Sequence, residues 1–292
     1  MNLKFFVRPN GDRIDYFDSG VGSDLLIYHH GTPGAGPLHA DMLDPAKASD
    51  LRIVELVRPG YGNSTRVTSR TVADVVDIAN DLADHLEFNR YVTMGWSGGG
   101  PHALANVALS PERCVAAMSL AGVGMYNQPD LDFLNGMGQD NHDEFGAALK
   151  GESDIRSYLE AGLDDMQKIT GAQIVDMMGS LLPEEDRDSL TGEFGENMAE
   201  IFRWAVSTGV DGWLDDDIAF VMPWGFELSK ITNPVTIWQG ATDLMVPFEH
   251  GKWLAKKIVH ADVNLLEGHG HLSIGEPALS KGFAWLKGHL SK

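Results

Sequence analysis

The sequence is poor in basic residues, in cysteine and in long apolar runs. Its 292 residues contain 22 lysines and arginines against 42 aspartates and glutamates, which gives a net charge of −20. Such an excess of negative charge repels the phosphates of nucleic acids and the headgroups of anionic lipids. We therefore expect no nucleic-acid partner and no docking to membranes through a basic patch.

The scarcity of cysteine and of apolar runs excludes further classes of protein. Cys114 is the only cysteine, which excludes an internal disulfide, and there is no CxxC motif or Cys/His cluster of the kind that binds structural zinc. No window reaches the roughly 18 consecutive apolar residues of a membrane span. The apolar run at residues 5–7 is too short for a signal peptide. We expect a cytoplasmic protein that needs no metal or other cofactor.

The acidic residues are concentrated in one segment. Residues 124–230 hold 23 aspartates and glutamates and 6 lysines and arginines, a net charge of −17, whereas the rest of the chain has a net charge of −3. This segment contains helix-like stretches and no convincing buried strand. It predicts a helical insert at 124–230 between two parts of a core, residues 1–123 and 231–292.

Outside the insert, apolar runs alternate with helical patterns. The runs at 25–28, 53–57, 91–94, 115–120, 235–238 and 263–266 are nearly continuous, as in parallel strands buried on both faces. Helical periodicity covers 72–86, with Thr71 as its N-cap, and also 103–109, 251–258 and 277–290. Strands that alternate with such helices form right-handed βαβ units. The sequence therefore predicts an α/β fold with a mostly parallel sheet of about eight strands and a ligand site beyond the strands' carboxyl ends.

A candidate nucleophile follows one of these strands. Residues 95–99 read Gly-Trp-Ser-Gly-Gly and match the G-x-S-x-G motif, whose glycines permit a tight strand-to-helix turn that exposes the serine. Roughly 0.2 matches are expected by chance in this composition, so the motif alone is weak. Its position directly after 91–94 and before the helical run 101–109 is the context the motif requires. Ser97 is thus the predicted nucleophile.

A serine hydroxyl needs a base and a residue that orients the base. Asp243 follows the strand 235–238, and His269 and His271 follow 263–266, so the order Ser, Asp, His is the one expected for this fold. Other interpretations stay open at this point: Asp243 as a turn residue, and the histidines as polar loop residues or half of a metal site.

An oxyanion formed at the serine needs two N–H donors. One is expected from Gly98, directly after the nucleophile, and the other from Thr32 in the glycine-rich loop 31–37. The same loop could cradle a phosphate, but it has neither the lysine of the G-x-x-x-x-G-K-[ST] motif nor the G-x-G-x-x-G spacing. The oxyanion hole is therefore the favoured interpretation.

Five motifs, in order, resemble the α/β-hydrolase superfamily over about residues 25–290. They are 30–34 (HGTPG), 58–62 (RPGYG), 95–99 (GWSGG), 240–243 (GATD) and 270–271 (GH). Residues 96–102 are also similar to actinobacterial members of that superfamily with no assigned substrate. The resemblance implies the α/β-hydrolase fold with 124–230 as a helical cap, and it favours His271 over His269 as the base.

The resemblance also narrows the chemistry. Dehalogenases and epoxide hydrolases of the superfamily have an aspartate as the nucleophile at the strand-to-helix turn, whereas this chain has Ser97 there. The resemblance implies a serine hydrolase that cleaves a small neutral ester or amide through an acyl-enzyme. Whether the protein forms a homo-oligomer is left open. Alternatives are a proline iminopeptidase-like aminopeptidase, although Thr32 departs from its H-G-G-P-G pattern, and a small-molecule receptor with the same fold. Carbon–carbon bond hydrolases and perhydrolases share the serine triad.

The insert carries residues for a substrate pocket. Its aromatic residues are expected mainly to pack the cap onto the core, with a few of them facing substrate. They include Phe202, Trp204, Trp213, Phe220, Trp224 and Phe226. The aspartates 215–217 are expected in a solvated helix start or turn. If the acidic segment 124–230 covers the active site, its negative charges should disfavour anionic substrates. This repulsion acts within the screening length of about 10 Å at 0.1 M salt.

Overall fold

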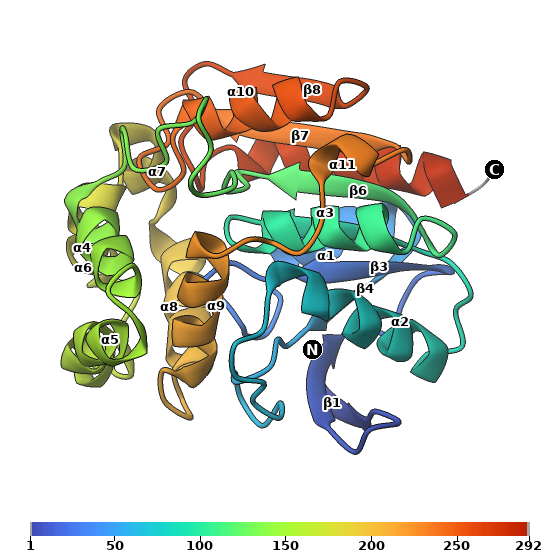
Figure 1. The fold of residues 1–292 in the computed structure, drawn as a ribbon, viewed down its shortest axis with the longest axis horizontal. Coiled ribbons are helices and arrows are strands. Elements are labelled where there is room, and N and C mark those ends of the chain that lie inside the picture. The colour runs from blue at the N-terminus through green and yellow to red at the C-terminus, as the bar shows by residue number, and fades with distance from the viewer. Residues whose placement is uncertain (1, 291–292) are drawn as a thin grey trace.

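The computed structural model describes residues 2–290 and contains a central sheet of eight strands flanked by helices (Figure 1). The strands are β1 (Asn2–Val7), β2 (Arg13–Asp18), β3 (Asp24–His29), β4 (Leu51–Leu56), β5 (Tyr91–Trp96), β6 (Cys114–Leu120), β7 (Val235–Gly240) and β8 (Asp262–Leu266). Their order across the sheet is β1-β2-β4-β3-β5-β6-β7-β8. The predicted α/β class and strand number are confirmed.

Six of the strands run parallel, as their apolar sequences predicted. Leu26 of β3 pairs with Ile53 of β4 and with Val92 of β5, and all three side chains are fully buried. The strands β1 and β2 run antiparallel at one edge. The strand β1 was not predicted, since its apolar run covers only residues 5–7 and most of its residues are exposed.

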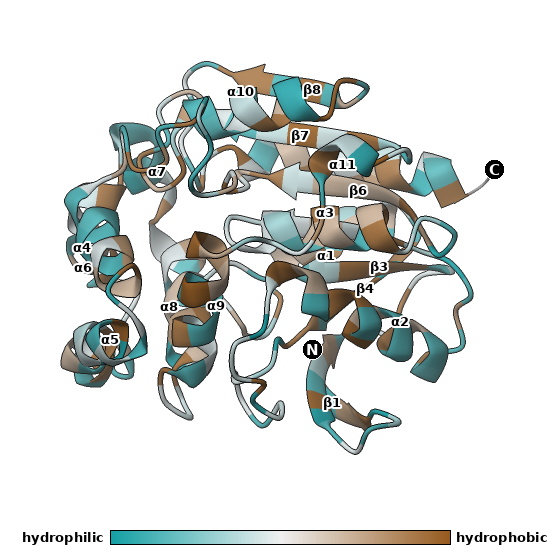
Figure 2. Cartoon of the chain, viewed as in Figure 1, coloured by the Kyte–Doolittle hydropathy of each residue, from teal (hydrophilic) through white to brown (hydrophobic). Residues whose placement is uncertain are grey.

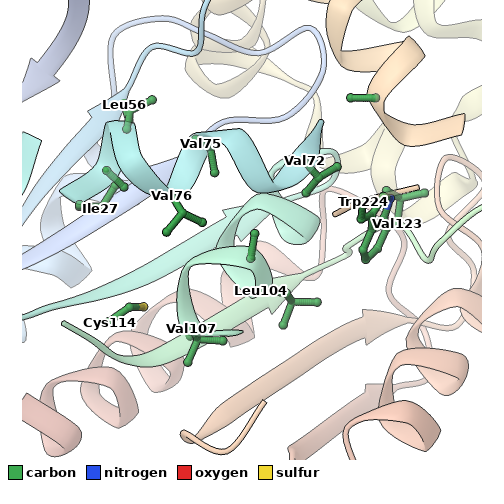
Figure 3. Packing of buried hydrophobic residues seen from close by; sticks show 14 of the residues in the cluster. Ile27, Leu56, Val72, Val75, Val76, Leu104, Val107, Cys114, Val123 and Trp224 are labelled. Carbon is green, nitrogen blue, oxygen red and sulfur yellow. The ribbon is translucent and has the colours of Figure 1, made fainter. Parts of the chain in front are cut away.

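Helices cover both faces of the sheet. They are α1 (Ala40–Ala48), α2 (Val75–His85), α3 (Gly99–Leu109), α10 (Phe248–Lys257) and α11 (Gly275–Leu290). Because side chains alternate along a strand, Ile27 joins the cluster formed with α2, α3 and α10, whereas Leu26 joins the one formed with α1 and α11. Figure 3 shows part of the first cluster, with Ile27, Val76 and Leu104.

The helical pattern predicted from Thr71 onward begins with a 3₁₀ turn. The turn covers Val72–Asp74 and leads directly into α2. The Asp74 carboxylate accepts a hydrogen bond from the Thr71 N–H (2.6 Å), one of the orphan donors at the start of the helix. Thr71 therefore marks the helix start that the sequence indicated.

The segment between β6 and β7 is helical and contributes no strand to the sheet formed by residues 2–290. Its helices are α4 (Gln139–Ala148), α5 (Glu152–Met166), α6 (Ile174–Met178), α7 (Glu184–Ser189), α8 (Gly192–Ala205) and α9 (Asp211–Val221). Figure 1 shows them together beyond one end of the sheet. Hydrophilic and hydrophobic residues alternate around these helices (Figure 2), as expected where one side is solvated.

One prediction about this segment is wrong. Residues 215–217 lie inside α9 and are 5%, 0% and 1% exposed, respectively, in place of a solvated helix start or turn. Asp215 and Asp216 can be buried because arginines of the core supply their counter-charges. Arg66 pairs with Asp215, and Arg58 and Arg70 pair with Asp216.

Among residues 2–290, no helix combines the length and the apolar content needed to cross a bilayer.

Candidate active site

Ser97 sits at a strained turn between β5 and α3. Its φ is +56°, a conformation that non-glycine residues seldom adopt. A Cβ at Gly95 would collide with the carbonyl of Gly99, and a Cβ at Gly99 would collide with the carbonyl of His29. Only glycine fits at both positions, which is the physical basis of the motif at 95–99.

The structure brings His271, and not His269, to Asp243. The distance from His271 Nδ1 to Asp243 Oδ2 is 2.8 Å, and both side chains are buried. Asp243 also accepts hydrogen bonds from the N–H groups of Met245 (2.9 Å) and Val246 (2.8 Å). His269 Nδ1 instead lies 3.3 Å from the carbonyl oxygen of Ser273. His271 lines the same cavity as Ser97.

The surroundings of His271 make its ring more basic. Burial lowers its pKa, but the negative charges of Asp243 and Asp186 and the hydrogen bond to Asp243 outweigh burial, so the pKa is raised above its usual 6.5. A more basic imidazole is a stronger proton acceptor, and it becomes protonated at a higher pH.

Asp186 of α7 holds the loop that carries His271. One carboxylate oxygen accepts the His271 N–H (2.7 Å), and the other accepts the N–H groups of Leu272 (3.1 Å) and Ser273 (2.9 Å) and the Ser273 hydroxyl (2.8 Å). A Cβ at Gly270 would meet this carboxylate. Sequence reasoning missed Asp186, since nothing distinguishes it from the other acidic residues of the segment.

The predicted oxyanion donors lie next to each other. A Cβ at Gly98 would come within 2.6 Å of the Thr32 hydroxyl oxygen, and both residues line a cavity with Ser97. Within residues 2–290, neither the Thr32 N–H nor the Gly98 N–H donates a hydrogen bond to another protein group. Both donors are therefore free to bind an oxygen atom of a ligand.

A buried ion-pair network ties the Thr32 loop to α9. Asp216 accepts hydrogen bonds from the Thr32 hydroxyl (2.8 Å), Arg58 Nε (3.0 Å) and Arg70 Nη2 (2.6 Å). Arg58 also donates to the carbonyls of His30 (2.6 Å) and Gly31 (2.8 Å). Burial alone would raise the pKa of Asp216, but the two guanidinium groups hold it well below its usual range. Asp216 thus remains an anion that fixes this loop.

Two cavities meet at Ser97 and Thr32. The larger has a volume of about 570 Å³ and the smaller of about 120 Å³. Aromatic residues of the 124–230 segment line the larger one, among them Phe202, Trp213 and Phe220, whereas Trp224 is fully buried elsewhere. Among the described residues, no lysine or arginine lines either cavity.

Carboxyl groups face the larger cavity. Glu144 and Asp217 lie side by side in its wall, and Trp213 Nε1 donates a hydrogen bond to Glu144 (2.8 Å). Burial raises the pKa of both carboxyls; the charge of Glu144 raises the pKa of Asp217 further, whereas hydrogen bonds with Trp213 and Asp217 partly offset the effect of burial on Glu144. Any of the carboxyls lining this cavity that is ionised repels an anion, and no lysine or arginine among the described lining residues offsets that charge. In residues 2–290, no group of three His, Cys, Asp or Glu side chains is arranged to hold a metal ion.

Comparisons with known proteins agree with this architecture. The chain is 23% identical to a 2-hydroxy-6-oxononadienedioate/2-hydroxy-6-oxononatrienedioate hydrolase of Cupriavidus pinatubonensis, over 94% of this chain and 91% of that protein. Its fold is similar to the enol-lactonase of Burkholderia xenovorans LB400 (TM-score 0.69, 16% identity, 99% and 100% of the chains). It is also similar to a bromoperoxidase of Bacillus anthracis (TM-score 0.68, 20% identity, 99% of each chain). The model of the alpha/beta hydrolase family matches residues 26–279, and the chain therefore belongs to that family.

Proposed function

We propose that the protein is a serine hydrolase that cleaves a small neutral ester or amide through an acyl-enzyme. The observation that carries this proposal is the 2.8 Å contact between His271 and Asp243 beside the cavity that Ser97 enters from its strained turn. A hydroxyl, an imidazole and a carboxylate in this order are the parts of a nucleophilic triad.

The roles follow from the contacts. The Ser97 oxygen attacks the substrate carbonyl while His271 takes the hydroxyl proton, and Asp243 stabilises the imidazolium that forms. The N–H groups of Thr32 and Gly98 hold the oxyanion. His271 then gives its proton to the leaving alcohol or amine as the carbonyl–heteroatom bond breaks. Water repeats the sequence on the acyl-enzyme and releases the acid.

Residues 124–230 serve as the cap of this site in the proposal. They supply most of the wall of the 570 Å³ cavity, a volume typical of small-molecule sites. Among the described residues, the wall of this cavity contains carboxyls and no lysine or arginine, so it disfavours anionic substrates such as phosphate esters or coenzyme A thioesters. A dicarboxylate of the kind named in the Cupriavidus relative would meet the same repulsion, so its substrate is not carried over to this chain.

An aminopeptidase of the proline iminopeptidase type is the second candidate. The carboxyls of Glu144 and Asp217 favour it, because a substrate ammonium group in the larger cavity would lie against them and would itself favour their ionised form. A receptor with this fold is a third candidate, and it would react with its ligand once per chain without repeated product release.

The test is a panel of p-nitrophenyl esters and aminoacyl amides of matched size and differing charge, at two ionic strengths. We expect repeated turnover of neutral esters, a kcat lower by about 10³-fold or more in Ser97→Ala, and no effect of Ser119→Ala. Ser119 is the matched control because its buried hydroxyl makes no hydrogen bond. Wild-type turnover in Ser97→Ala would contradict the mechanism. Faster release of amino-terminal proline than of any ester acyl group would establish the second candidate.

A further inference from the structure

The two cavities at Ser97 differ in size and in the groups that line them, and this difference assigns the two halves of the substrate. We propose that the acyl group occupies the larger cavity and the leaving alcohol occupies the smaller one, so that the protein prefers bulky acyl groups esterified to small alcohols. This inference rests on the proposed serine hydrolase function.

The lining residues separate the two chemical roles. Ser97 and Thr32 line both cavities, as expected for groups at the reacting carbonyl. His271 lines only the smaller cavity, and Gly98 lines only the larger one. The proton donor therefore faces one cavity and one of the two oxyanion donors faces the other.

The direction of proton transfer determines which cavity holds the alcohol and which holds the acyl group. When the tetrahedral intermediate collapses, the bond between the carbonyl carbon and the alkoxy oxygen breaks, and that oxygen takes the proton from His271. The alkoxy group must then lie on the His271 side, in the smaller cavity. The acyl chain leaves the carbonyl carbon in the remaining direction, past Gly98 into the larger cavity.

The volumes limit the size of each half. The smaller cavity, at about 120 Å³, lies well below the range of about 300–1,000 Å³ found for drug-sized ligands, and so favours the smaller half of the substrate. The larger cavity, at 570 Å³, lies within the range of about 300–1,000 Å³ found for drug-sized ligands.

Both walls are mainly apolar, and the smaller cavity has fewer carboxyls. It is lined by apolar side chains such as Leu38 and Met198, together with the carboxyls of Asp41 and Glu55. Its buried Glu55 accepts a hydrogen bond from the Gly36 N–H (2.9 Å), and burial raises the pKa of this carboxyl well above its usual range. The smaller cavity thus suits a short alkyl group. The larger cavity, with aromatic side chains and carboxyls, suits an aromatic or otherwise bulky acyl group that is neutral or cationic.

Two isomeric esters test the assignment, methyl 3-phenylpropanoate and 2-phenylethyl acetate. They have the same atoms and the same bulk, and they differ in which side of the ester group carries the phenyl ring. We expect kcat/KM to be at least about tenfold higher for the methyl ester, because the smaller cavity has about a fifth of the volume of the larger one and accommodates a methyl group more readily than a phenylethyl group. Within alkyl 3-phenylpropanoates, the rate should fall as the alcohol lengthens from methyl to butyl.

A matched pair of variants locates each half. Met198 lines only the smaller cavity and Met166 only the larger one, and both side chains are partly buried. Met198→Ala should extend the range of accepted alcohols and leave the acyl preference unchanged, whereas Met166→Ala should alter the acyl preference alone.

Equal rates on the two isomers, faster hydrolysis of 2-phenylethyl acetate, or a changed acyl preference in Met198→Ala would overturn the assignment. If Ser97 reacts with a fluorophosphonate in the same preparation, such a result refutes only the placement of the two halves. Failure to hydrolyse either isomer, together with an unreactive Ser97, refutes the serine hydrolase proposal itself.

Discussion

Replacement of Asp216 tests whether the buried ion pairs fasten the 124–230 segment to the core. Asp216 and Arg58 are fully buried and the Arg70 side chain is 4% exposed, so Asp216→Ala leaves two guanidinium groups uncompensated in the interior. Removal of one partner from a buried pair lowers the free energy of unfolding by about 3 to 5 kcal/mol. We expect a loss of at least this size, since the hydroxyls of Thr32 and Tyr61 lose their acceptor as well.

Asp211→Ala is the matched control on the same helix. The Asp211 side chain is 43% exposed and pairs with Arg66 and Arg156, which are 24% and 31% exposed. Exposed pairs of this kind contribute about 0 to 1 kcal/mol. Urea unfolding followed by tryptophan fluorescence gives the free energy of unfolding of each variant from the midpoint and the slope.

The pH dependence of this effect is also fixed by the structure. Because the folded pKa of Asp216 is depressed, its contribution is fully present above the unfolded value and is lost only as pH falls through the folded pKa. The difference between wild type and Asp216→Ala should therefore be constant around neutral pH. Equal stabilities of Asp216→Ala and Asp211→Ala would refute the reasoning.

Further predictions concern the reaction. Because the pKa of His271 is raised and the base must be neutral, kcat/KM should fall as pH drops through a midpoint above 6.5, as a pH–rate profile would show. Asp186→Asn removes a charge that raises this pKa, so the midpoint should move to lower pH, and an unchanged midpoint would contradict the contact. His271→Ala should reduce kcat on p-nitrophenyl esters as severely as Ser97→Ala, whereas His269→Ala should keep most of it; the reverse would exchange their roles. Neutral p-nitrophenyl esters should react faster than anionic ones of the same size, most clearly at low salt, and fastest turnover of the anionic members would refute the charge argument.

The sequence predicted the features that local chemistry dictates. Strands buried on both faces, such as β5, appear as continuous apolar runs, and the glycines around Ser97 mark a turn that no other residue fits. The edge strand β1 was not identified because its continuous apolar run is only residues 5–7, even though several of its exposed side chains are apolar. Local patterns thus specify buried parallel strands and tight turns well and exposed edge strands poorly.

Contacts between distant segments could not be predicted. Asp186 meets the His271 loop 85 residues away along the chain, and Asp216 meets Arg58 across 158 residues. In the sequence both aspartates belong to an acidic segment that favours a solvated interpretation, and only the fold brings their partners to them. The division of the site into two cavities arises in the same way, from side chains of helices that the sequence places far from Ser97.

Covalent labelling of Ser97 tests the central claim most directly. The protein would be incubated with a fluorophosphonate, and the adduct would be measured by intact-protein mass spectrometry and located by peptide mapping. We predict a single adduct on Ser97 in the wild type, none in Ser97→Ala, slowed labelling in His271→Ala and wild-type labelling in Ser119→Ala. An unlabelled wild-type protein, or an adduct on another residue that persists in Ser97→Ala, would contradict a serine nucleophile at this site.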